Sequence, residues 1–369
     1  MSAHDTSRPI TVVLGTRPEI IKLAKIVELL GDDVYIVHTG QHFDVNLSES
    51  FFAEFGMRPP DTFIGVGGQT RGEQLGNGTA ALDKLFATLH PSAVVVQGDT
   101  NAVLAGALAA NANNVPIAHV EAGLRSFDRA MPEEHNRVVA DHLADLCLAP
   151  TDLNVANLAA EGINGPRVLL TGNPIIEAVE RLMPEPAEQH DIAKGFGLDP
   201  ESFVLATFHR PENVDDPGRL ENILTALGGL ELPVLLPLHP RTQQRIAEFG
   251  LESFAATVQI VDPIGYRTFI GLGARARLVV SDSGGVQEEV SVYKKPAVVV
   301  RRSTERQEVE GTFVERHEPD ETLADSLSSA LDGAEQKAKE LEDVPSPYGD
   351  ETAPAQIVSA IRDLVRSRS

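Results

Sequence analysis

The stretch ITVVLGTRPEIIKLAKIVELL, residues 10–30, determines the fold that we predict for the whole chain. Its first part, Ile10–Gly15, is a short run rich in Val and Ile, which is typical of a strand buried on both faces. Its second part, Pro18–Leu30, has proline in the first turn, where a missing N–H is tolerated, so we predict a helix. A buried strand followed at once by a helix begins a βαβ unit and indicates a parallel sheet.

The same strand-then-helix rhythm recurs in two series. The first continues with VYIVHTG, AVVVQGD, PIAHVEAG, LCLAP and RVLLTGN. After Asn173-Pro174 the second has SFVLATFH, LPVLLPLH, TVQIVDP, ARLVVSDSGG and PAVVVR. We therefore predict an α/β fold of two Rossmann-like domains with parallel sheets facing a cleft. The predicted domains are residues 1–172 and 173–352, with a polar connector at 335–350 and a final helix at 353–369 that packs back on the first domain.

The composition limits the class of protein. Of 369 residues, 42% are hydrophobic and 23% are charged, which argues against disorder. A net charge of −23 repels phosphate backbones, so we expect no nucleic-acid partner. Lysine is scarce while arginine and acidic residues are common. Such a surface suits molar salt, where the Debye length is about 3 Å; a salt-loving source and an ordinary acidic enzyme are the two interpretations.

The start of the chain and its apolar runs indicate the compartment. MSAHDTSRPITVVLG has no basic segment followed by a long apolar stretch, so we expect no signal peptide. The longest apolar runs, such as Ala102–Ala110, are far below the roughly 20 residues that span a bilayer. The single cysteine, Cys147, lies in a strand-like segment and predicts a buried thiol with no disulfide. We expect a cytoplasmic protein without a membrane partner.

Glycines and charged residues follow several predicted strands at their carboxyl ends, where ligands of parallel sheets bind. In SDSGGVQEE, residues 281–289, Gly284 and Gly285 leave backbone N–H groups uncovered at a helix N-terminus, which favours a diphosphate. Ser283 can add a hydroxyl donor, and Glu289 can accept hydrogen bonds from ribose hydroxyls. The candidate phosphate cations are Arg17, Lys22 and Arg306. A plain capped turn and solvated charges are the alternatives.

Three carboxylates, Asp99, Glu121 and Glu133, lie at or just after strand ends of the predicted first domain. Glu133 and Glu134 are neighbours near a helix start and point about 100° apart, so we expect one to face the cleft and the other to be a solvated charge. A cap or a salt bridge would explain any one of these carboxylates alone. Three carboxylates at the mouth of one cleft favour a role in acid–base catalysis.

Other patterns point away from cofactors. GLGARA, residues 271–276, fits G-x-G-x-x-A but precedes a strand, whereas a dinucleotide-binding turn follows one, so we predict ordinary helix and loop. The chain has no Walker A pattern, and no His/Cys cluster has metal spacing. Histidines are scattered over different strand ends, at His38, His42, His209 and His239. We predict no metal and no cofactor.

Taken together, GTRPEIIK, TGQH, GDT, HVEAGLRS, PEEHNR, HRPEN and SDSGGVQEE with TERQE resemble the non-hydrolysing UDP-N-acetylglucosamine 2-epimerases. The segments follow the family's order from residue 15 to about residue 308. The resemblance implies a glycosyltransferase-B-like fold, a homodimer, and a UDP-sugar bound mainly by the second domain. It implies catalytic roles for Asp99, Glu121, Glu133 and His209. It implies substrate binding by Arg17, Lys22, Ser283, Gly284, Gly285, Glu289 and Arg306.

The chemistry of such an epimerase explains these residue types. The hydrogen on carbon 2 has no neighbouring carbonyl, so a modest base cannot remove it directly. If the bond from carbon 1 to the diphosphate breaks first, positive charge at carbon 1 acidifies that hydrogen, and cations and amides must stabilise the leaving group. A glycal and UDP then recombine after a proton returns to the opposite face of carbon 2. We assign His209 to the leaving diphosphate.

Two departures from the family pattern concern regulation. Pro211 follows His209-Arg210, where many bacterial relatives have a second arginine, and HPRT at 239–242 differs from a common HPN version. In bacterial members a second substrate molecule activates the enzyme, and Gln41 and His42 resemble part of that site. Pro211 argues against such regulation here.

Three alternatives share much of this pattern. An epimerase of a modified sugar, such as a 2,3-diacetamido uronate, would use the same chemistry. A glycosyltransferase of the same fold would not need three clustered acids in its first domain. A nucleotide-sugar sensor would bind its ligand even without those acids.

Overall fold

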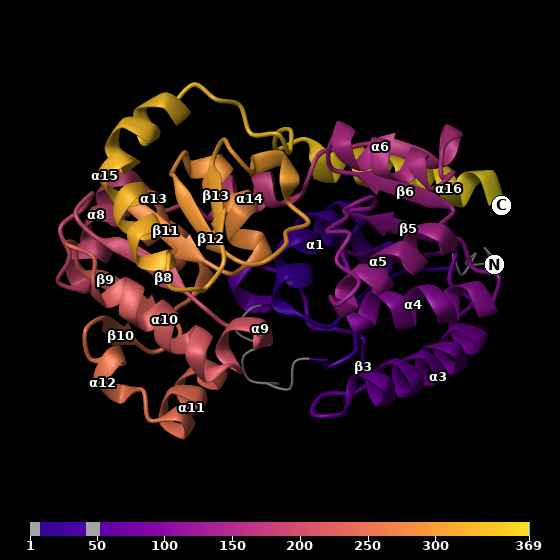
Figure 1. Ribbon diagram of the computed structural model, residues 1–369. Coiled ribbons are helices and arrows are strands. Elements are labelled where there is room, and N and C mark those ends of the chain that lie inside the picture. The colour runs from indigo at the N-terminus through magenta and orange to yellow at the C-terminus, as the bar shows by residue number, and fades with distance from the viewer. Residues whose placement is uncertain (1–7, 42–51, 369) are drawn as a thin grey trace. The chain divides into compact units, whose positions relative to one another are not determined.

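The computed structural model describes residues 8–41 and 52–368, and it contains two parallel sheets (Figure 1). The first has the strand order β3-β2-β1-β4-β5-β6-β7, and the second has the order β10-β9-β8-β11-β12-β13. The strands of the first sheet are β1 (Ile10–Leu14), β2 (Val34–His38), β3 (Thr62–Phe63), β4 (Ala93–Gln97), β5 (Ile117–Val120), β6 (Leu146–Ala149) and β7 (Val168–Leu170). Those of the second are β8 (Val204–Thr207), β9 (Val234–Pro237), β10 (Gln259–Val261), β11 (Leu278–Ser281), β12 (Ala297–Val300) and β13 (Val314–His317).

Helices connect the strands of each sheet. The helices associated with the first sheet are α1 (Arg17–Leu30), η1 (Gly31–Asp33), α3 (Arg71–Leu89), α4 (Asn101–Ala112), α5 (Pro132–Leu143), α6 (Asp152–Ala160), η2 (Gly165–Arg167) and the C-terminal α16 (Ala353–Arg368). The helices associated with the second sheet are α8 (Pro186–Gly195), α9 (Pro211–Val214), α10 (Pro217–Gly228), α11 (Pro240–Phe249), α12 (Glu252–Ala255), α13 (Tyr266–Arg275), α14 (Gly284–Tyr293), η3 (Gln307–Val309) and α15 (Leu323–Leu341). Between the two series lies α7 (Ile175–Leu182).

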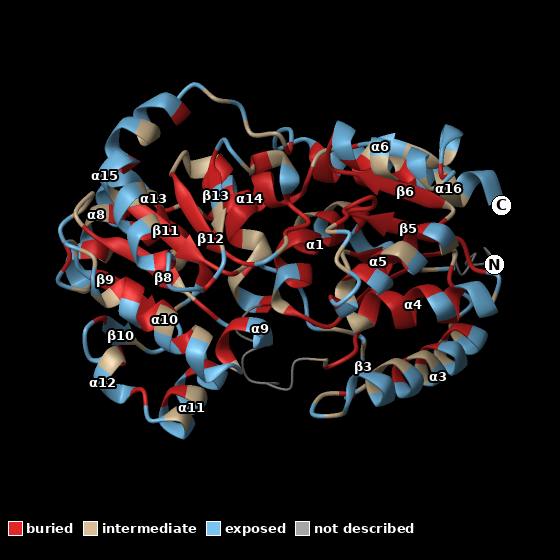
Figure 2. Cartoon of the chain, viewed as in Figure 1, coloured by how far each residue is buried: buried red, intermediate tan, exposed pale blue. Residues whose placement is uncertain are grey.

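The central strands of each sheet are buried, as the uninterrupted apolar runs predict (Figure 2). All five residues of β1 are buried, and its register pairs Val12 with Ile36 on one side and Val95 on the other. The Ala-rich helix α4 packs against this sheet at Gly106, where an added Cβ would come within 3.0 Å of Val96 and 3.3 Å of Val13. Small side chains therefore let α4 lie close to the strands that carry the site.

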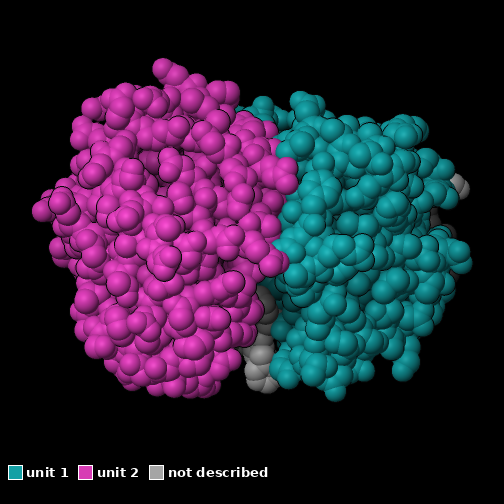
Figure 3. Space-filling view, viewed as in Figure 1, with its two compact units in different colours: residues 1–178, 348–369 teal, residues 179–347 magenta. Residues whose placement is uncertain are grey.

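The chain forms two compact units, residues 1–178 with 348–369 and residues 179–347 (Figure 3). The first unit carries β1–β7, and the second carries β8–β13. The chain passes from the first unit to the second within α7, after residue 178, whereas the predicted boundary followed residue 172. The final helix α16 belongs to the first unit and packs beside α1, where Arg362 donates to the carbonyl of Leu29 at 2.9 Å. This confirms that the C-terminal helix returns to the first unit.

Several smaller predictions have clear outcomes. The GLGARA segment forms the end of helix α13 and its C-cap, Ala276, as the prediction of ordinary helix and loop requires. Cys147 is a buried free thiol. The prediction of a connector over 335–350 is wrong at its start, because α15 continues to Leu341. Strands β3 and β13 were not predicted at all. Within the described ranges, no helix combines the length and apolar character needed to cross a membrane.

Gly123, in the turn after β5, allows a close approach that a side chain would prevent. Its φ is +87°, and an added Cβ would lie 2.4 Å from the carbonyl oxygen of Asn154. We expect Gly123→Ala to destabilise the protein by about 3 kcal/mol or more, because backbone strain and overpacking add. Urea unfolding should measure this loss. Gly76→Ala is the matched control: Gly76 lies exposed in α3 with open space around it, and alanine there should stabilise by about 1 kcal/mol. Equal effects of the two substitutions on stability would contradict the claim that the close approach of Gly123 to Asn154 requires glycine.

Candidate active site

The residue after β5, Glu121, is fixed through both its backbone and its side chain. Its φ of +68° is in the left-handed region that non-glycine residues seldom adopt. The backbone N–H donates to the carbonyl of Leu148 at 3.0 Å. Lys22 Nζ donates to Oε1 at 2.7 Å, Asn173 donates to Oε1 at 3.4 Å, and Gln97 donates to Oε2. Because all three side-chain partners are donors, the buried carboxylate acts as an acceptor in each contact. Such backbone strain concentrates at functional sites.

Asp99 follows β4 and is held by α5. The Arg137 guanidinium donates to Asp99 Oδ2 through both Nε, at 3.2 Å, and Nη2. Asn136 of the same helix donates to the Asp99 carbonyl at 2.8 Å. Arg137 is buried, whereas the Asp99 side chain is 25% exposed, so one face of this carboxylate is open to a ligand. Sequence reasoning missed Arg137, although it ends the PEEHNR segment.

The two neighbouring glutamates of α5 have different environments. Glu134 is buried and accepts hydrogen bonds from the backbone N–H groups of Ser126 and Phe127, both at 2.9 Å, and from Arg137. The prediction that the second carboxylate is a solvated charge is therefore wrong, because the preceding loop needs an acceptor for its N–H groups. Glu133 is half-buried, and its side chain makes no hydrogen bond or ion pair with residues 8–41 and 52–368. Of the pair, Glu133 is the carboxylate that a ligand can reach.

The two candidate cations of the first unit lie on α1. Arg17, the first residue of the helix, is half-buried beside the turn after β1. Lys22 is fully inside the unit and forms its ion pair with Glu121. The structure thus brings together Lys22 and Glu121, whose roles were predicted separately. Removing one partner of such a buried pair leaves an uncompensated charge.

Glu19 closes the turn between β1 and α1. Its Oε2 accepts from the N–H of Gly15 at 2.9 Å and from the hydroxyl of Thr16 at 2.8 Å. Its Oε1 accepts from the hydroxyl of Thr100 at 3.0 Å, which ties this turn to the start of α4. Burial raises the pKa of Glu19 to about 7, although these hydrogen bonds act in the opposite direction.

The raised pKa of Glu19 predicts a specific pH dependence of stability. The folded protein holds this proton more tightly than the unfolded chain, whose ordinary pKa is 4.5. The contribution of Glu19 is therefore fully present below about pH 4.5 and is lost as the pH rises through about 7. We expect the difference in unfolding free energy between Glu19→Gln and the parent to move in favour of the variant by up to about 3 kcal/mol across this window.

Urea unfolding at a series of pH values measures this difference, in which the effects of overall charge cancel. Glu73→Gln is the sign control, because hydrogen bonds from Thr70 lower the pKa of Glu73. Its contribution is present above about pH 4.5 and is lost as the pH falls below that value. The difference for this variant should therefore change only below about pH 4.5, and with the opposite sign. A constant difference for Glu19→Gln from pH 4.5 to pH 8 would contradict the prediction.

A buried polar network supports the loop that carries Glu121. His119 Nδ1 lies 2.7 Å from Asp141 Oδ1, and its Nε2 lies 2.8 Å from the Gly98 carbonyl oxygen. Asp141 Oδ2 accepts from the Gly123 N–H at 3.1 Å and from Arg125 at 2.7 Å. Burial alone would lower the pKa of His119, but Asp141 raises it above its ordinary value. This network joins the turns after β4 and β5 and so fixes the positions of both catalytic candidates.

In the second unit, the N-terminus of α14 follows β11 directly. Ser283 is its N-cap, but its side chain makes no capping hydrogen bond. Gly284 and Gly285 begin the helix and are half-buried. An added Cβ on Gly284 would lie 2.8 Å from Glu305 Oε1. Glycine therefore permits the close approach of the Glu305 carboxylate to the start of α14.

Arginines near this helix are matched by carboxylates of the protein. Glu305 lies 2.9 Å from Arg301 Nη2, 3.4 Å from Arg306 Nη1 and 3.8 Å from Arg210 Nη2. Arg306 also donates from Nε to Glu288 at 2.6 Å. The predicted phosphate cation Arg306 is thus buried and preorganised by two carboxylates.

Glu289, predicted to bind a ribose, is buried one turn into α14. The Tyr266 hydroxyl donates to its Oε1 at 3.1 Å. Burial and the neighbouring Glu289 raise the pKa of Tyr266 well above its ordinary value. The pair connects α13 to α14 and orients the Glu289 carboxylate.

His209 follows β8 and lies against Asp282, which follows β11. His209 Nδ1 is 3.2 Å from Asp282 Oδ1, and the backbone N–H groups of His209 and Arg210 donate to the same carboxylate at 3.2 and 2.9 Å. Burial alone would raise the pKa of Asp282, but His209 and the Arg210 N–H lower it. Sequence reasoning missed Asp282, although it lies within SDSGG.

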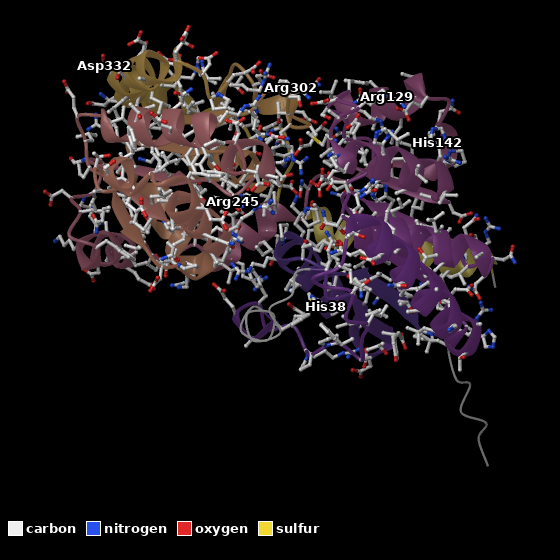
Figure 4. The ribbon with its side chains drawn as sticks, turned by 60° about the horizontal axis from the view of Figure 1, so that its bottom comes forward. His38, Arg129, His142, Arg245, Arg302 and Asp332 are labelled. Atoms are coloured by element: carbon white, nitrogen blue, oxygen red, sulfur yellow. The ribbon has the colours of Figure 1, made fainter. Side chains whose placement is uncertain are left out.

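The other histidines named from the sequence have different surroundings, and the His239 ring lies 6.2 Å from the His209 ring, centroid to centroid. His38 ends β2 (Figure 4). Its ring stacks on that of Phe63 with centroids 5.3 Å apart. His239, the N-cap of α11, accepts from the N–H of Arg241 at 3.2 Å. His42 lies outside the described residues, whereas Gln41 accepts from the N–H of Ala102 at 3.1 Å. In the described part of the chain, no group of three or more His, Cys, Asp or Glu side chains could hold a metal ion.

Two parallel-sheet α/β units, with polar residues gathered at the carboxyl ends of their strands, define a glycosyltransferase-B-like fold. The family model for UDP-N-acetylglucosamine 2-epimerase matches residues 29–362. The chain belongs to the UDP-N-acetylglucosamine 2-epimerase family.

Individual relatives agree with this assignment. The chain is 41% identical over 313 residues to the UDP-N-acetylglucosamine 2-epimerase of Methanocaldococcus jannaschii, covering 81% of this chain and 85% of that protein. It is also 41% identical over 305 residues to the UDP-2,3-diacetamido-2,3-dideoxy-D-glucuronate 2-epimerase of Pseudomonas aeruginosa, covering 80% and 84%. The solved Methanocaldococcus jannaschii UDP-GlcNAc 2-epimerase in complex with UDP-GlcNAc and UDP matches with a TM-score of 0.87 at 35% identity, covering 96% and 99%.

Proposed function

We propose that the protein interconverts UDP-N-acetylglucosamine and UDP-N-acetylmannosamine by eliminating and re-adding UDP. The observation that carries the proposal is Glu121, a strained, buried carboxylate held by Lys22 at 2.7 Å in a member of this epimerase family. Relatives named for this activity, and a solved relative in complex with UDP-GlcNAc and UDP, support the choice of substrate. The chemistry requires no metal or cofactor.

Residues of the second unit act on the leaving group. We assign the diphosphate to the N–H groups of Gly284 and Gly285, the Ser283 hydroxyl and Arg306, with Glu289 on the ribose. His209 donates a proton to the departing diphosphate. When the bond from carbon 1 to the diphosphate oxygen breaks, its electron pair leaves with UDP and positive charge develops on the sugar. Preorganised donors are effective because they need no rearrangement as this charge develops.

Carboxylates of the first unit move the proton on carbon 2. One of Asp99, Glu121 and Glu133 accepts the proton from carbon 2, and the C–H electron pair forms the double bond of the glycal. A second carboxyl group, which begins the cycle protonated, then gives its proton to the opposite face of carbon 2. UDP adds back to carbon 1 and returns its proton to His209. The two faces require two groups, and Arg17 binds the substrate from the turn after β1. Arg137 and Lys22 hold Asp99 and Glu121 in place for these transfers.

The proposal also includes the oligomeric state and the cellular compartment of the enzyme. We propose a cytoplasmic homodimer, on the strength of the family resemblance and the lack of any membrane-crossing helix among the described residues. Size-exclusion chromatography with light scattering tests the dimer: the chain mass is 39.6 kDa, so a particle of twice that mass is expected.

A second candidate is 2-epimerisation of UDP-2,3-diacetamido-2,3-dideoxy-D-glucuronate, because a relative named for that reaction is also 41% identical. Purified protein is incubated with each UDP-sugar at low and high salt and followed by proton NMR. We expect UDP-N-acetylmannosamine from UDP-N-acetylglucosamine. Turnover of the diacetamido uronate alone would favour the second candidate, and free N-acetylmannosamine would indicate a hydrolysing enzyme. Binding without any conversion would indicate a sensor.

A further inference from the structure

We propose that Asp282 is a positioning residue that fixes the imidazole of His209 with Nδ1 turned inward and Nε2 presented outward. The proposal rests on the proposed function, because the outward nitrogen is the one that would meet the leaving diphosphate. Asp282 belongs to the SDSGG segment, whose glycines and serine already have roles, but sequence reasoning gave the aspartate none. It acts through His209 and is not itself assigned a contact with substrate.

The contacts of Asp282 converge on one segment, the turn after β8. The carboxylate is fully buried, and it accepts from the backbone N–H of His209 at 3.2 Å and of Arg210 at 2.9 Å. Asn213 Nδ2 donates to Oδ2 at 3.2 Å. Arg210 Nε also donates to the Asp282 carbonyl oxygen at 2.9 Å. One aspartate therefore holds the start and the end of the HRPEN segment against β11.

The same carboxylate determines how the His209 ring points. Oδ1 lies 3.2 Å from Nδ1, whereas the side chain of His209 is 44% exposed and that of Asp282 is 0% exposed. Among the described residues, Nε2 of His209 has no hydrogen-bond partner, and the His239 ring lies 6.2 Å from this ring, centroid to centroid. A carboxylate beside one ring nitrogen fixes both the tautomer and the orientation of an imidazole. Nδ1 should therefore carry its proton toward Asp282.

The first test reads the ring itself and does not depend on turnover. Protein labelled with 15N-histidine is compared with His209→Gln to assign the ring resonances of His209. We expect the parent protein to show a protonated Nδ1, and Asp282→Asn to lose this preference, since an amide can donate to Nδ1. A neutral ring with its proton on Nε2 and none on Nδ1 in the parent protein would overturn the proposal, even if Asp282→Asn failed to fold.

The second test is a double-mutant cycle on turnover of UDP-N-acetylglucosamine. We expect Asp282→Asn to lower kcat about 100-fold, with KM changed by less than about 3-fold, because misorientation of a catalytic group costs about this much. In the His209→Gln background the same substitution should add less than about 3-fold. Asp216→Asn, which alters an exposed helix cap nearby, is the matched control and should keep kcat within about 2-fold.

The outcomes separate this proposal from the proposed function. A full additional 100-fold loss in the His209→Gln background would mean that Asp282 acts independently of His209, and the proposal would be wrong. A parent protein with the expected ring state but no epimerisation would contradict the proposed function and leave the positioning intact. The control for folding is that Asp282→Asn keeps the circular dichroism spectrum of the parent protein and binds UDP with an affinity within about 3-fold of the parent.

Discussion

Glu121→Gln should lower kcat by at least about 1,000-fold, since glutamine cannot exchange a proton with carbon 2. Geometry should change little, because Gln97 Oε1 is buried without a hydrogen-bond partner in the described part of the chain. That amide can turn its oxygen toward the new side-chain NH2 group, while Lys22 keeps an oxygen partner. Initial rates with UDP-N-acetylglucosamine measure the effect.

A loss of stability accompanies this substitution and has to be separated from the loss of catalysis. The buried ammonium of Lys22 loses its counter-charge, which costs about 3–5 kcal/mol. Rates are therefore measured at a temperature where circular dichroism shows both proteins folded, and UDP affinity is measured alongside. Activity within about 10-fold of the parent under these conditions would remove Glu121 from proton transfer.

Glu133→Gln should lower kcat by at least about 100-fold with little change in melting temperature. The Glu133 side chain makes no hydrogen bond or ion pair with the described residues, so the substitution breaks no such contact there. The measurement pairs initial rates with thermal unfolding. Full activity would exclude Glu133 from the mechanism.

The neighbouring Glu134 provides a matched control on the same helix. Its carboxylate accepts from two backbone N–H groups and pairs with the buried Arg137. Glu134→Gln should therefore lower the melting temperature, with Arg137 left partly uncompensated. The two substitutions thus differ in kind: one reduces turnover in a stable protein, and the other reduces stability. The reverse result would mean that we have assigned the two roles to the wrong residues.

Long apolar strands and their helices were predictable because burial on both faces requires uninterrupted Val and Ile. β3 and β13 were not predictable: β13, with the sequence VERH, has only one apolar residue, and β3 has only two residues. The end of α15 was missed through its polar composition. Leu327, Ala334 and Leu341 are nevertheless buried at seven-residue intervals, the spacing of one helix face.

The sequence motifs predicted which segments form the candidate site, but not how their side chains pair. Glu19, Arg137 and Asp282 all lie inside recognised segments, yet each also has a partner in a distant turn: Thr100, Asp99 and His209, respectively. Pairing depends on which turns the topology places next to each other. The choice between Glu133 and Glu134 illustrates the point, because it depends on unpaired N–H groups in a loop seven or eight residues earlier.

The electrostatics of the two units also depend on pairing. The net charge of −23 opposes the binding of an anionic ligand. Within the two units, Lys22, Arg137 and Arg306 are each buried with a carboxylate of the protein. Such pairs are weakly screened by salt, because the ions are removed from solvent. The local charge arrangement should therefore persist at high ionic strength.

The central claim is that departure of UDP makes the hydrogen on carbon 2 exchangeable with carboxylates of the first unit. The most direct measurement is incubation of UDP-N-acetylglucosamine with the protein in heavy water, followed by proton NMR and mass spectrometry of the nucleotide sugars. We predict deuterium at carbon 2 of the UDP-N-acetylmannosamine formed. Epimerised product that retains its original hydrogen would contradict the account.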